Sequence, residues 1–136
     1  MEGKYHINVD KRIPAGAGLG GGSSNAALTL RMLNKIEDLG LSEEQLIELS
    51  RDIGADVAFF IQGKPGLGSG LGNEISPLGI QPNLYILTVY PNFESSTAEA
   101  YQYCDPSVEH DIPLEKILTE YEPDEWRYML DNDLEL

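Results

Sequence analysis

One stretch near the N-terminus decides the fold class, and it reads Ile13-Pro14-Ala15-Gly16-Ala17-Gly18-Leu19-Gly20-Gly21-Gly22-Ser23-Ser24-Asn25-Ala26-Ala27. Its glycines run directly into an alanine-rich segment that is typical of a helix start. Glycine lets the backbone approach a ligand closely and adopts positive φ freely. The first N–H groups of a helix lack internal partners and carry the positive end of the helix dipole. The stretch therefore predicts a loop that binds phosphate.

Polar side chains at the end of this loop add possible ligands. Ser23 and Ser24 supply hydroxyls where a helix N-cap, a phosphate ligand or a Mg²⁺ ligand would be needed. Asn25 is an equally good capping residue. The alternative is an ordinary flexible glycine loop, but such loops seldom lie between an apolar strand and an alanine-rich helix start. We therefore favour anion binding.

The composition fits a globular domain with a strong acidic excess. The chain has 136 residues, of which 41% are hydrophobic, and its nine basic and 23 acidic residues give a net charge of −14. This charge repels nucleic acids and anionic membranes, so neither is an expected partner. The acidic residues of the last third are scattered, which predicts a solvated surface. An anionic substrate must therefore be held locally.

Cysteine and histidine usage indicates neither a disulfide nor a metal centre. The single cysteine, Cys104, excludes an internal disulfide and fits a reducing compartment. His6 and His110 have no partners at metal-ligand spacing, so no metal-ligating side chain is assigned. The sequence shows no apolar run of membrane-spanning length and no signal-peptide core at its start. A cytoplasmic location is expected.

The first half of the chain predicts a strand and two helices around the loop. Alternation over Tyr5–Val9 predicts a strand, and helical spacing predicts a helix from Asn25 to about Ile36. Ser42 and Gln45 form a capping box that starts a second helix. One face of this second helix carries Leu46, Leu49 and Ile53.

Further along, Val57–Ile61 is short and apolar and fits either a strand or a buried helical turn. Glycines between residues 63 and 72 predict a strand or hairpin that passes close to another part of the molecule. A strand is expected over Leu84–Tyr90, ended by Pro91. Three helices are then expected: from Ser96-Thr97 to about Tyr103, from Pro113 to Tyr121 and from Pro123 to Leu130.

Two general glycine motifs compete as explanations of the loop. A Walker A loop is excluded because no Gly-Lys-Ser/Thr follows the glycines. Residues 16–21 do satisfy G-x-G-x-x-G, with Glu37 or Asp38 near the spacing of a ribose-binding acid. That motif would indicate a dinucleotide-dependent oxidoreductase. Such a fold requires a parallel strand after the first helix, whereas the next clear element is the capped helix at Ser42.

The whole run from Pro14 to Ala27 resembles the central motif of the GHMP small-molecule kinases. The triple glycine, Leu33-Asn34, Leu41-Ser42 and Ile53-Gly54-Ala55-Asp56-Val57-x-Phe59-Phe60 narrow the resemblance to the branch that acts on a cytidine-diphosphate-linked methylerythritol. The resemblance implies an α+β fold of the GHMP kinase type, with an N-terminal part like ribosomal protein S5 domain 2, here incomplete. Helices would cover one face of a mainly antiparallel sheet.

The resemblance also implies an activity and its residues. The activity is ATP-dependent phosphorylation of the substrate's 2-hydroxyl, with ATP and Mg²⁺ as cofactors and the cytidine-diphosphate-linked alcohol as partner. Asp56 is the expected catalytic base, although an aspartate in this position is also a common turn residue or helix cap. The expected cofactor-binding residues are Pro14, Gly16, Gly18, Leu19, Gly20, Gly21, Gly22, Ser23, Ser24 and Asn25.

The resemblance covers only the middle of such a kinase, so the chain is expected to be a fragment lacking both ends. Residues 1–91 would belong to the ATP-binding N-terminal domain and residues 92–136 to the start of the C-terminal domain. The family's lysine near the reacting hydroxyl cannot be assigned to Lys4, Lys11, Arg12, Lys35 or Lys64. Missing strands would leave exposed edges that favour self-association.

Two other functions stay open beside this kinase. The chain could be an inactive fragment that keeps the phosphate loop and binds nucleotide without turnover. It could also come from another GHMP kinase, one that acts on mevalonate, homoserine or a sugar, because these enzymes share the loop. Binding of ATP without phosphoryl transfer would favour the first of these alternatives.

Overall fold

The structure, a computed structural model, describes residues 4–70, 72–81, 83–91, 96–105 and 110–134. Its contacts divide the chain into two units, Met1–Ser76 and Pro77–Leu136. The domain boundary expected after residue 91 comes from the resemblance to a family. The division by contacts does not test it, so it stays a prediction. No helix in the described ranges is long and apolar enough to cross a membrane.

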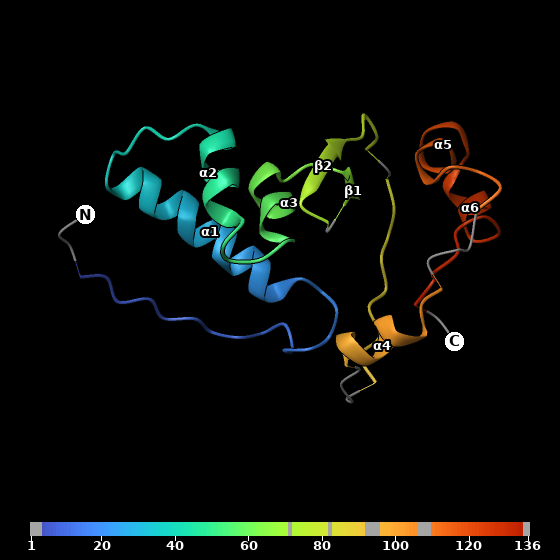
Figure 1. Cartoon of the computed structure of the whole chain (residues 1–136), viewed down its shortest axis with the longest axis horizontal. Helices are drawn as coiled ribbons and strands as arrows, with labels where there is room; N and C mark the ends of the chain where they lie inside the picture. The colour runs from blue at the N-terminus through green and yellow to red at the C-terminus, as the bar shows by residue number, and fades with distance from the viewer. Residues whose placement is uncertain (1–3, 71, 82, 92–95, 106–109, 135–136) are drawn as a thin grey trace. The chain divides into compact units, whose positions relative to one another are not determined.

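The first unit consists of three helices followed by a hairpin (Figure 1). Helix α1 spans Gly21–Ile36, α2 spans Glu43–Ser50 and α3 spans Val57–Gln62. Strands β1 (Gly66–Ser69) and β2 (Glu74–Pro77) pair with each other. Both α1 and α2 pack against α3. The apolar run at 57–61 is thus a buried helix and not a strand, and the glycine-rich segment is a hairpin as expected.

Apolar side chains from all three helices form the core of this unit. Ala27 of α1, Leu46 of α2 and Val57 and Ile61 of α3 are all nearly inaccessible to solvent, and Phe60 packs against them. Burial of this shared face stabilises α2 and α3, which are too short to be stable alone. The core therefore fixes α3 against α1, close to where α1 begins.

Helix α1 begins earlier than the expected Asn25, because Gly21 and Gly22 already belong to it. At its other end, the Asn34 side chain fixes the turn that leads into α2. Its Nδ2 donates to the Leu41 carbonyl at 3.0 Å, and its Oδ1 accepts from the Leu41 N–H at 3.0 Å. The capping box at Ser42 is confirmed. Because a helix follows α1, the parallel strand that a dinucleotide fold requires there is absent from this described segment.

The prediction of strands over Tyr5–Val9 and Leu84–Tyr90 is wrong. Neither segment is paired in a sheet within the described ranges, although the first runs alongside α1 (Figure 1). The side chains of Tyr85 and Ile86 are almost fully exposed. A strand requires a hydrogen-bonded neighbour, so alternation of apolar residues alone does not make one. In the described residues, the only sheet is the β1–β2 hairpin.

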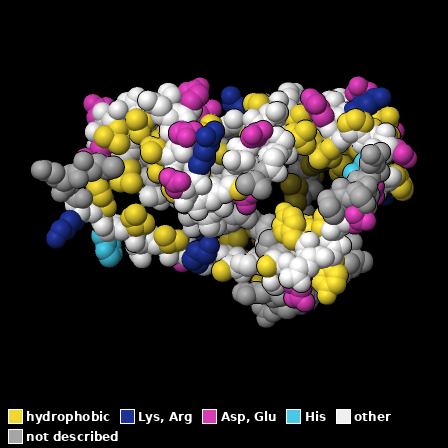
Figure 2. All heavy atoms as spheres, viewed as in Figure 1, with side chains coloured by type: hydrophobic (Ala, Val, Ile, Leu, Met, Phe, Trp, Pro, Cys, Tyr) yellow, Lys and Arg dark blue, Asp and Glu magenta, His cyan; other side chains and the backbone are white. Residues whose placement is uncertain are grey.

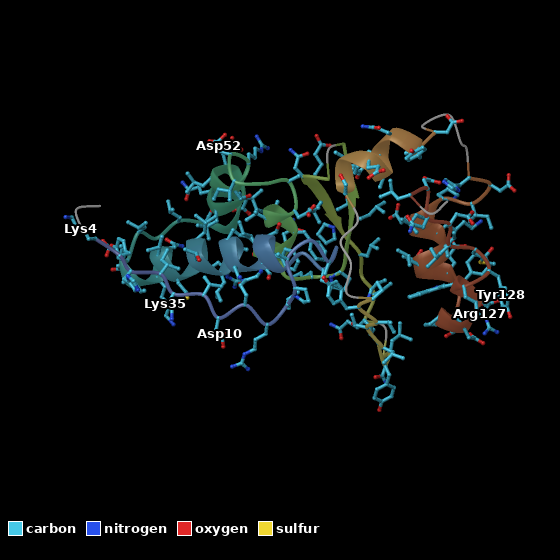
Figure 3. The ribbon with its side chains drawn as sticks, turned by 90° about the horizontal axis from the view of Figure 1, so that it is seen from below. Lys4, Asp10, Lys35, Asp52, Arg127 and Tyr128 are labelled. Atoms are coloured by element: carbon cyan, nitrogen blue, oxygen red, sulfur yellow. The ribbon has the colours of Figure 1, made fainter. Side chains whose placement is uncertain are left out.

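The second unit contains three short helices, which are α4 (Thr97–Tyr103), α5 (Leu114–Glu120) and α6 (Pro123–Trp126). All three were expected, but α6 ends before the predicted Leu130. After Trp126 the chain continues in turns, with the Met129 N–H donating to the Trp126 carbonyl at 3.0 Å. Arg127 lies over the Tyr128 ring in this segment (Figure 3).

One histidine links the two ends of the α5–α6 segment. The Nδ1 of His110 lies 3.5 Å from Asp131, and its Nε2 lies 3.1 Å from Asp133. The hydrogen bond and the negative charge of Asp133 raise the pKa of His110 above its ordinary value. Within the described ranges, no group of three or more acidic, histidine or cysteine side chains could hold a metal ion.

Candidate functional site

The glycine loop folds around a hollow of about 240 Å³. Gly16, Gly18 and Gly20 all have positive φ, between 62° and 69°, which residues with a side chain rarely adopt. This alternation turns the backbone back on itself in front of α1. The hollow brings together most of the residues expected to bind the cofactor, namely Pro14, Gly16, Gly18, Leu19, Gly20, Gly21, Gly22 and Ser23.

The hollow contains the N-terminus of α1, which no side chain closes. Gly20 occupies the N-cap position and offers no side-chain hydrogen bond. The first bond of the helix runs from the Ser24 N–H to the Gly20 carbonyl at 2.9 Å. The N–H groups of residues 21–23 precede that bond and therefore have no acceptor inside the helix. The first turn carries no acidic residue either, so the positive end of the dipole is uncompensated.

Two of the expected cofactor-binding residues, Ser24 and Asn25, lie outside this hollow. The Ser24 hydroxyl donates to the Gly21 carbonyl at 3.1 Å, and the Asn25 carbonyl accepts from the Thr29 hydroxyl at 2.8 Å. Of the roles open to Ser23, Ser24 and Asn25, that of helix N-cap is excluded, because Gly20 holds that position. Of the two loop serines, Ser23 lines the hollow.

Lys11 lines the same hollow and brings a positive charge to it. A methyl group built on Gly21 would lie 3.5 Å from the Lys11 Nζ. The sequence alone assigns no role to Lys11, although this residue lies only two positions before Ile13, where the loop begins. Lys4 and Lys35, by contrast, lie at the opposite end of the first unit (Figure 3). In a chain with a net charge of −14, a lysine beside an open helix N-terminus creates a local positive potential that can attract an anion.

A second hollow, of about 460 Å³, places Asp56 next to the loop. Its walls come from loop residues 18–20, from Asp56, Phe59 and Phe60 at α3, and from the hairpin residues Gly68, Gly72 and Ile75. Because residues 18–20 line both hollows, the two adjoin. Asp56 is at the N-cap position of α3, but its side chain makes no capping hydrogen bond. Its carboxylate is exposed at this hollow, as a group that meets a ligand must be.

The arrangement joins an anion site to a carboxylate. Main-chain N–H groups and a lysine favour a phosphate in the first hollow. A carboxylate in the adjoining hollow can accept a hydrogen bond from a hydroxyl and take its proton. This pairing suits transfer of a phosphoryl group to an alcohol, a reaction that depends on positioning and on neutralising charge.

Comparison with known proteins agrees with this description. Residues 2–64, which include the loop and Asp56, match the model of the GHMP kinases N terminal domain. The chain is 46% identical over 96 residues to a 4-diphosphocytidyl-2-C-methyl-D-erythritol kinase of Citrifermentans bemidjiense, covering 71% of this chain and 34% of that protein. It is 42% identical over 130 residues to the protein of the same name from a Geobacter species, covering 95% of this chain and 46% of that protein.

A solved structure is similar as well. The crystal structure of a 4-(cytidine 5′-diphospho)-2C-methyl-D-erythritol kinase superposes with a TM-score of 0.69 at 32% identity, covering 92% of this chain and 45% of the other. The chain thus spans less than half the length of these relatives. The resemblance to the GHMP kinases and the GHMP kinase-type α+β fold expected from the sequence are confirmed.

Proposed function

We propose that this chain carries the nucleotide-binding part of an ATP-dependent kinase that phosphorylates the 2-hydroxyl of 4-diphosphocytidyl-2-C-methyl-D-erythritol. The observation that carries the proposal is the open N-terminus of α1, which lies in a hollow adjoining that of Asp56. The names of the relatives supply the acceptor. We retain the division into an ATP-binding part, residues 1–91, and the start of a second domain, residues 92–136.

In this proposal the loop holds the phosphates of ATP. The N–H groups of Gly21, Gly22 and Ser23 donate to phosphate oxygens, and the Lys11 ammonium neutralises part of their charge. Mg²⁺ prefers oxygen ligands and commonly binds to nucleotide phosphates. Ser23, which lines the phosphate hollow, carries a hydroxyl that fits the ion, whereas Asp56 in the adjoining hollow is left to the acceptor hydroxyl.

Asp56 orients the acceptor hydroxyl and accepts its proton. The proton moves to the carboxylate while the hydroxyl oxygen bonds to the terminal phosphorus of ATP and the bond from that phosphorus to the ADP oxygen breaks. The phosphate hollow keeps the reacting groups close, which supplies much of the rate enhancement of phosphoryl transfer. Leu19 and the glycines beside it separate the two hollows and so determine their spacing.

A test of this function compares Asp56→Asn with the parent chain. Transfer is expected to fall by roughly 10²- to 10⁴-fold, the usual contribution of a general base, while the affinity for ATP stays within about twofold. The matched control is Asp52→Asn, because Asp52 lies after α2 and lines neither hollow. Binding is measured by calorimetry and transfer by the appearance of the phosphorylated product.

The same assays decide between this function and the alternatives. Binding of ATP without any transfer to any acceptor would favour an inactive nucleotide-binding fragment. Transfer to mevalonate, homoserine or a sugar in preference to the cytidyl alcohol would assign the chain to another kinase of the family. Equal loss of ATP binding and of transfer in Asp56→Asn would contradict the role of Asp56 as the base.

We further propose that the isolated chain self-associates. Hydrophobic side chains lie at the surface of both units among the charged ones (Figure 2). In the second unit, Leu87 and Val89 are 88% and 77% exposed, in a segment without charge. An exposed, uncharged segment of high strand propensity tends to pair with another copy. Light scattering after gel filtration is expected to give a mass above that of the monomer, and a monomer at all concentrations would contradict this.

A further inference from the structure

The Phe60 ring contacts the backbone of the glycine loop. A methyl group built on Gly20 would lie 2.6 Å from Cζ and 2.8 Å from Cε2 of Phe60. Both distances are shorter than carbon atoms tolerate, so the ring already occupies the space that any side chain at residue 20 would require. Gly20 also has a φ of 62°. The loop therefore needs glycine at this position for two independent reasons, its backbone conformation and the ring beside it.

The same ring belongs to the helix that carries Asp56. Phe60 follows Asp56 by four residues, and the Phe60 N–H lies 3.5 Å from the Asp56 carbonyl. Side chains four residues apart share one face of a helix. Accordingly, Asp56 and Phe60 line the same hollow as Gly20. A shift of the ring relative to the loop would change the separation between the carboxylate and the N-terminus of α1.

The ring is held from its other sides as well. Phe59 packs against it edge to face, with ring centroids 5.3 Å apart and an angle of 81° between the planes. Phe60 also packs against the core cluster formed by α1, α2 and α3. These contacts restrict the positions that the partly buried ring can take. What it supports is Gly20, the residue at which the chain enters α1.

We propose that Phe60 is the positioning residue that fixes the phosphate loop at a set distance from Asp56. Its ring restrains Gly20, and Gly20 in turn directs the N–H groups of residues 21–23 into the phosphate hollow. The inference rests on the proposed function, because it gives the contact a role in holding ATP against the base. It adds to that function a residue that does not itself touch the phosphates.

A double-mutant cycle between Gly20 and Phe60 tests this role. Gly20→Ala is expected to weaken ATP binding by at least about tenfold, since the methyl group displaces either the ring or the loop. In the presence of Phe60→Leu, the added loss caused by Gly20→Ala is expected to shrink to about threefold or less, because the obstructing ring is gone. Equal losses in both backgrounds would overturn the proposal.

Gly40→Ala is the matched control for backbone strain. Gly40 has a φ of 65°, nothing lies within 4 Å of a methyl group built on it, and it lies in the turn between α1 and α2. This variant has the same left-handed strain without the ring contact. It is expected to lower stability while leaving ATP affinity unchanged. An equal loss of ATP affinity in Gly40→Ala would show that strain alone explains the effect, and would overturn the role of Phe60.

If Phe60→Leu folds poorly, Phe60→Tyr and the Gly20 Hα signals in the NMR spectrum provide a second test. A tyrosine hydroxyl would extend from Cζ, the atom closest to the methyl built on Gly20, so Phe60→Tyr is expected to weaken ATP binding at least about threefold in a folded chain. ATP binding equal to that of the parent would contradict the proposal. The Gly20 Hα signals are expected to carry a ring-current shift that persists in Phe59→Leu and is lost in Phe60→Leu.

The experiments distinguish a failure of the positioning role of Phe60 from a failure of nucleotide binding by the chain. If the parent chain binds no ATP although the Gly20 ring-current shift is present, the nucleotide-binding function fails and the positioning role fails with it. If the parent binds ATP and the cycle is additive, only the role of Phe60 is overturned. Absence of the Gly20 shift in the parent would show that the ring does not contact the loop, and would also overturn that role.

Discussion

Helices α1 and α2 lie in the same unit and pack on the same third helix, yet their N-termini differ. At α2, the Ser42 hydroxyl accepts from the Gln45 N–H at 3.3 Å, and the Gln45 side chain accepts from the Ser42 N–H at 2.9 Å. Glu43 and Glu44 add negative charge to the first turn. At α1, Gly20 offers no side-chain hydrogen bond, and the first turn of the helix contains no acidic residue.

The difference separates a helix end built for stability from one available to a ligand. A serine N-cap typically contributes about 1 kcal/mol, and acids in the first turn add to it. Helix α1 has neither a serine N-cap nor acids in its first turn. It is stabilised by its buried face, on which Ala27 is 1% exposed. Its free N–H groups are therefore left for an anion, whereas those of α2 are already used within the chain.

The largest expected effect comes from closing α1 in the way that α2 is closed. Ser23→Asp places a carboxylate in the first turn of α1, and ATP affinity is expected to fall at least about tenfold. Like charges about 4 Å apart repel by about 1 kcal/mol in water and about 4 kcal/mol near a protein surface. Calorimetric titration measures the affinity, and chemical denaturation should show α1 no less stable.

Ser23→Asn is the control for this change, because it has nearly the same size and no charge. It is expected to retain most of the affinity for ATP. If the asparagine and aspartate variants lose affinity equally, the charge is not responsible, and the comparison between an open and a closed helix end loses its basis.

The next effect concerns stability and belongs to α2. Ser42→Ala removes the capping box, so the free energy of unfolding is expected to drop by about 1 kcal/mol, with ATP affinity unchanged. Urea denaturation followed by circular dichroism measures the drop. Ser23→Ala is the matched change at α1 and is expected to stay within about 0.5 kcal/mol of the parent. A larger loss at Ser23 than at Ser42 would reverse the assignment of the two helix ends.

The smallest effect is a pH dependence confined to α2. The Ser42 hydroxyl donates to the Glu44 carboxylate at 2.7 Å and lowers the pKa of Glu44 below its usual value of 4.5. Because the folded pKa is the lower one, this contribution is fully present above pH 4.5 and is lost as the pH falls through the folded pKa. A carbon-13 titration of the Glu44 carboxyl group should show a higher pKa in Ser42→Ala than in the parent, because the largest cause of the lowering is then removed.

Features encoded by neighbouring residues were predictable from the sequence. The capping box at Ser42 depends on a residue only three positions away, and the glycine loop depends on backbone freedom that glycine alone has. Both are confirmed. The apolar run at 57–61 stayed ambiguous because its periodicity fits a buried helix and a buried strand equally well. Only its packing against α1 and α2 resolves it.

Features that depend on distant partners were not predictable. The alternation at Tyr5–Val9 does not reveal whether a neighbouring strand is available, and within the described ranges none pairs with it. The proximity of Lys11 to the loop hollow arises from how the loop turns back, and the contact of Phe60 with Gly20 joins residues 40 positions apart. Such contacts become visible only in three dimensions.

An amide NMR titration of the chain with ATP shows whether the N-terminus of α1 binds the phosphates. We expect the amide signals of residues 18–23 to shift together and saturate, while those of residues 43–45 at α2 stay in place. Unchanged signals in residues 18–23 at ATP concentrations that saturate binding, or equal shifts at the two helix ends, would contradict phosphate binding at α1.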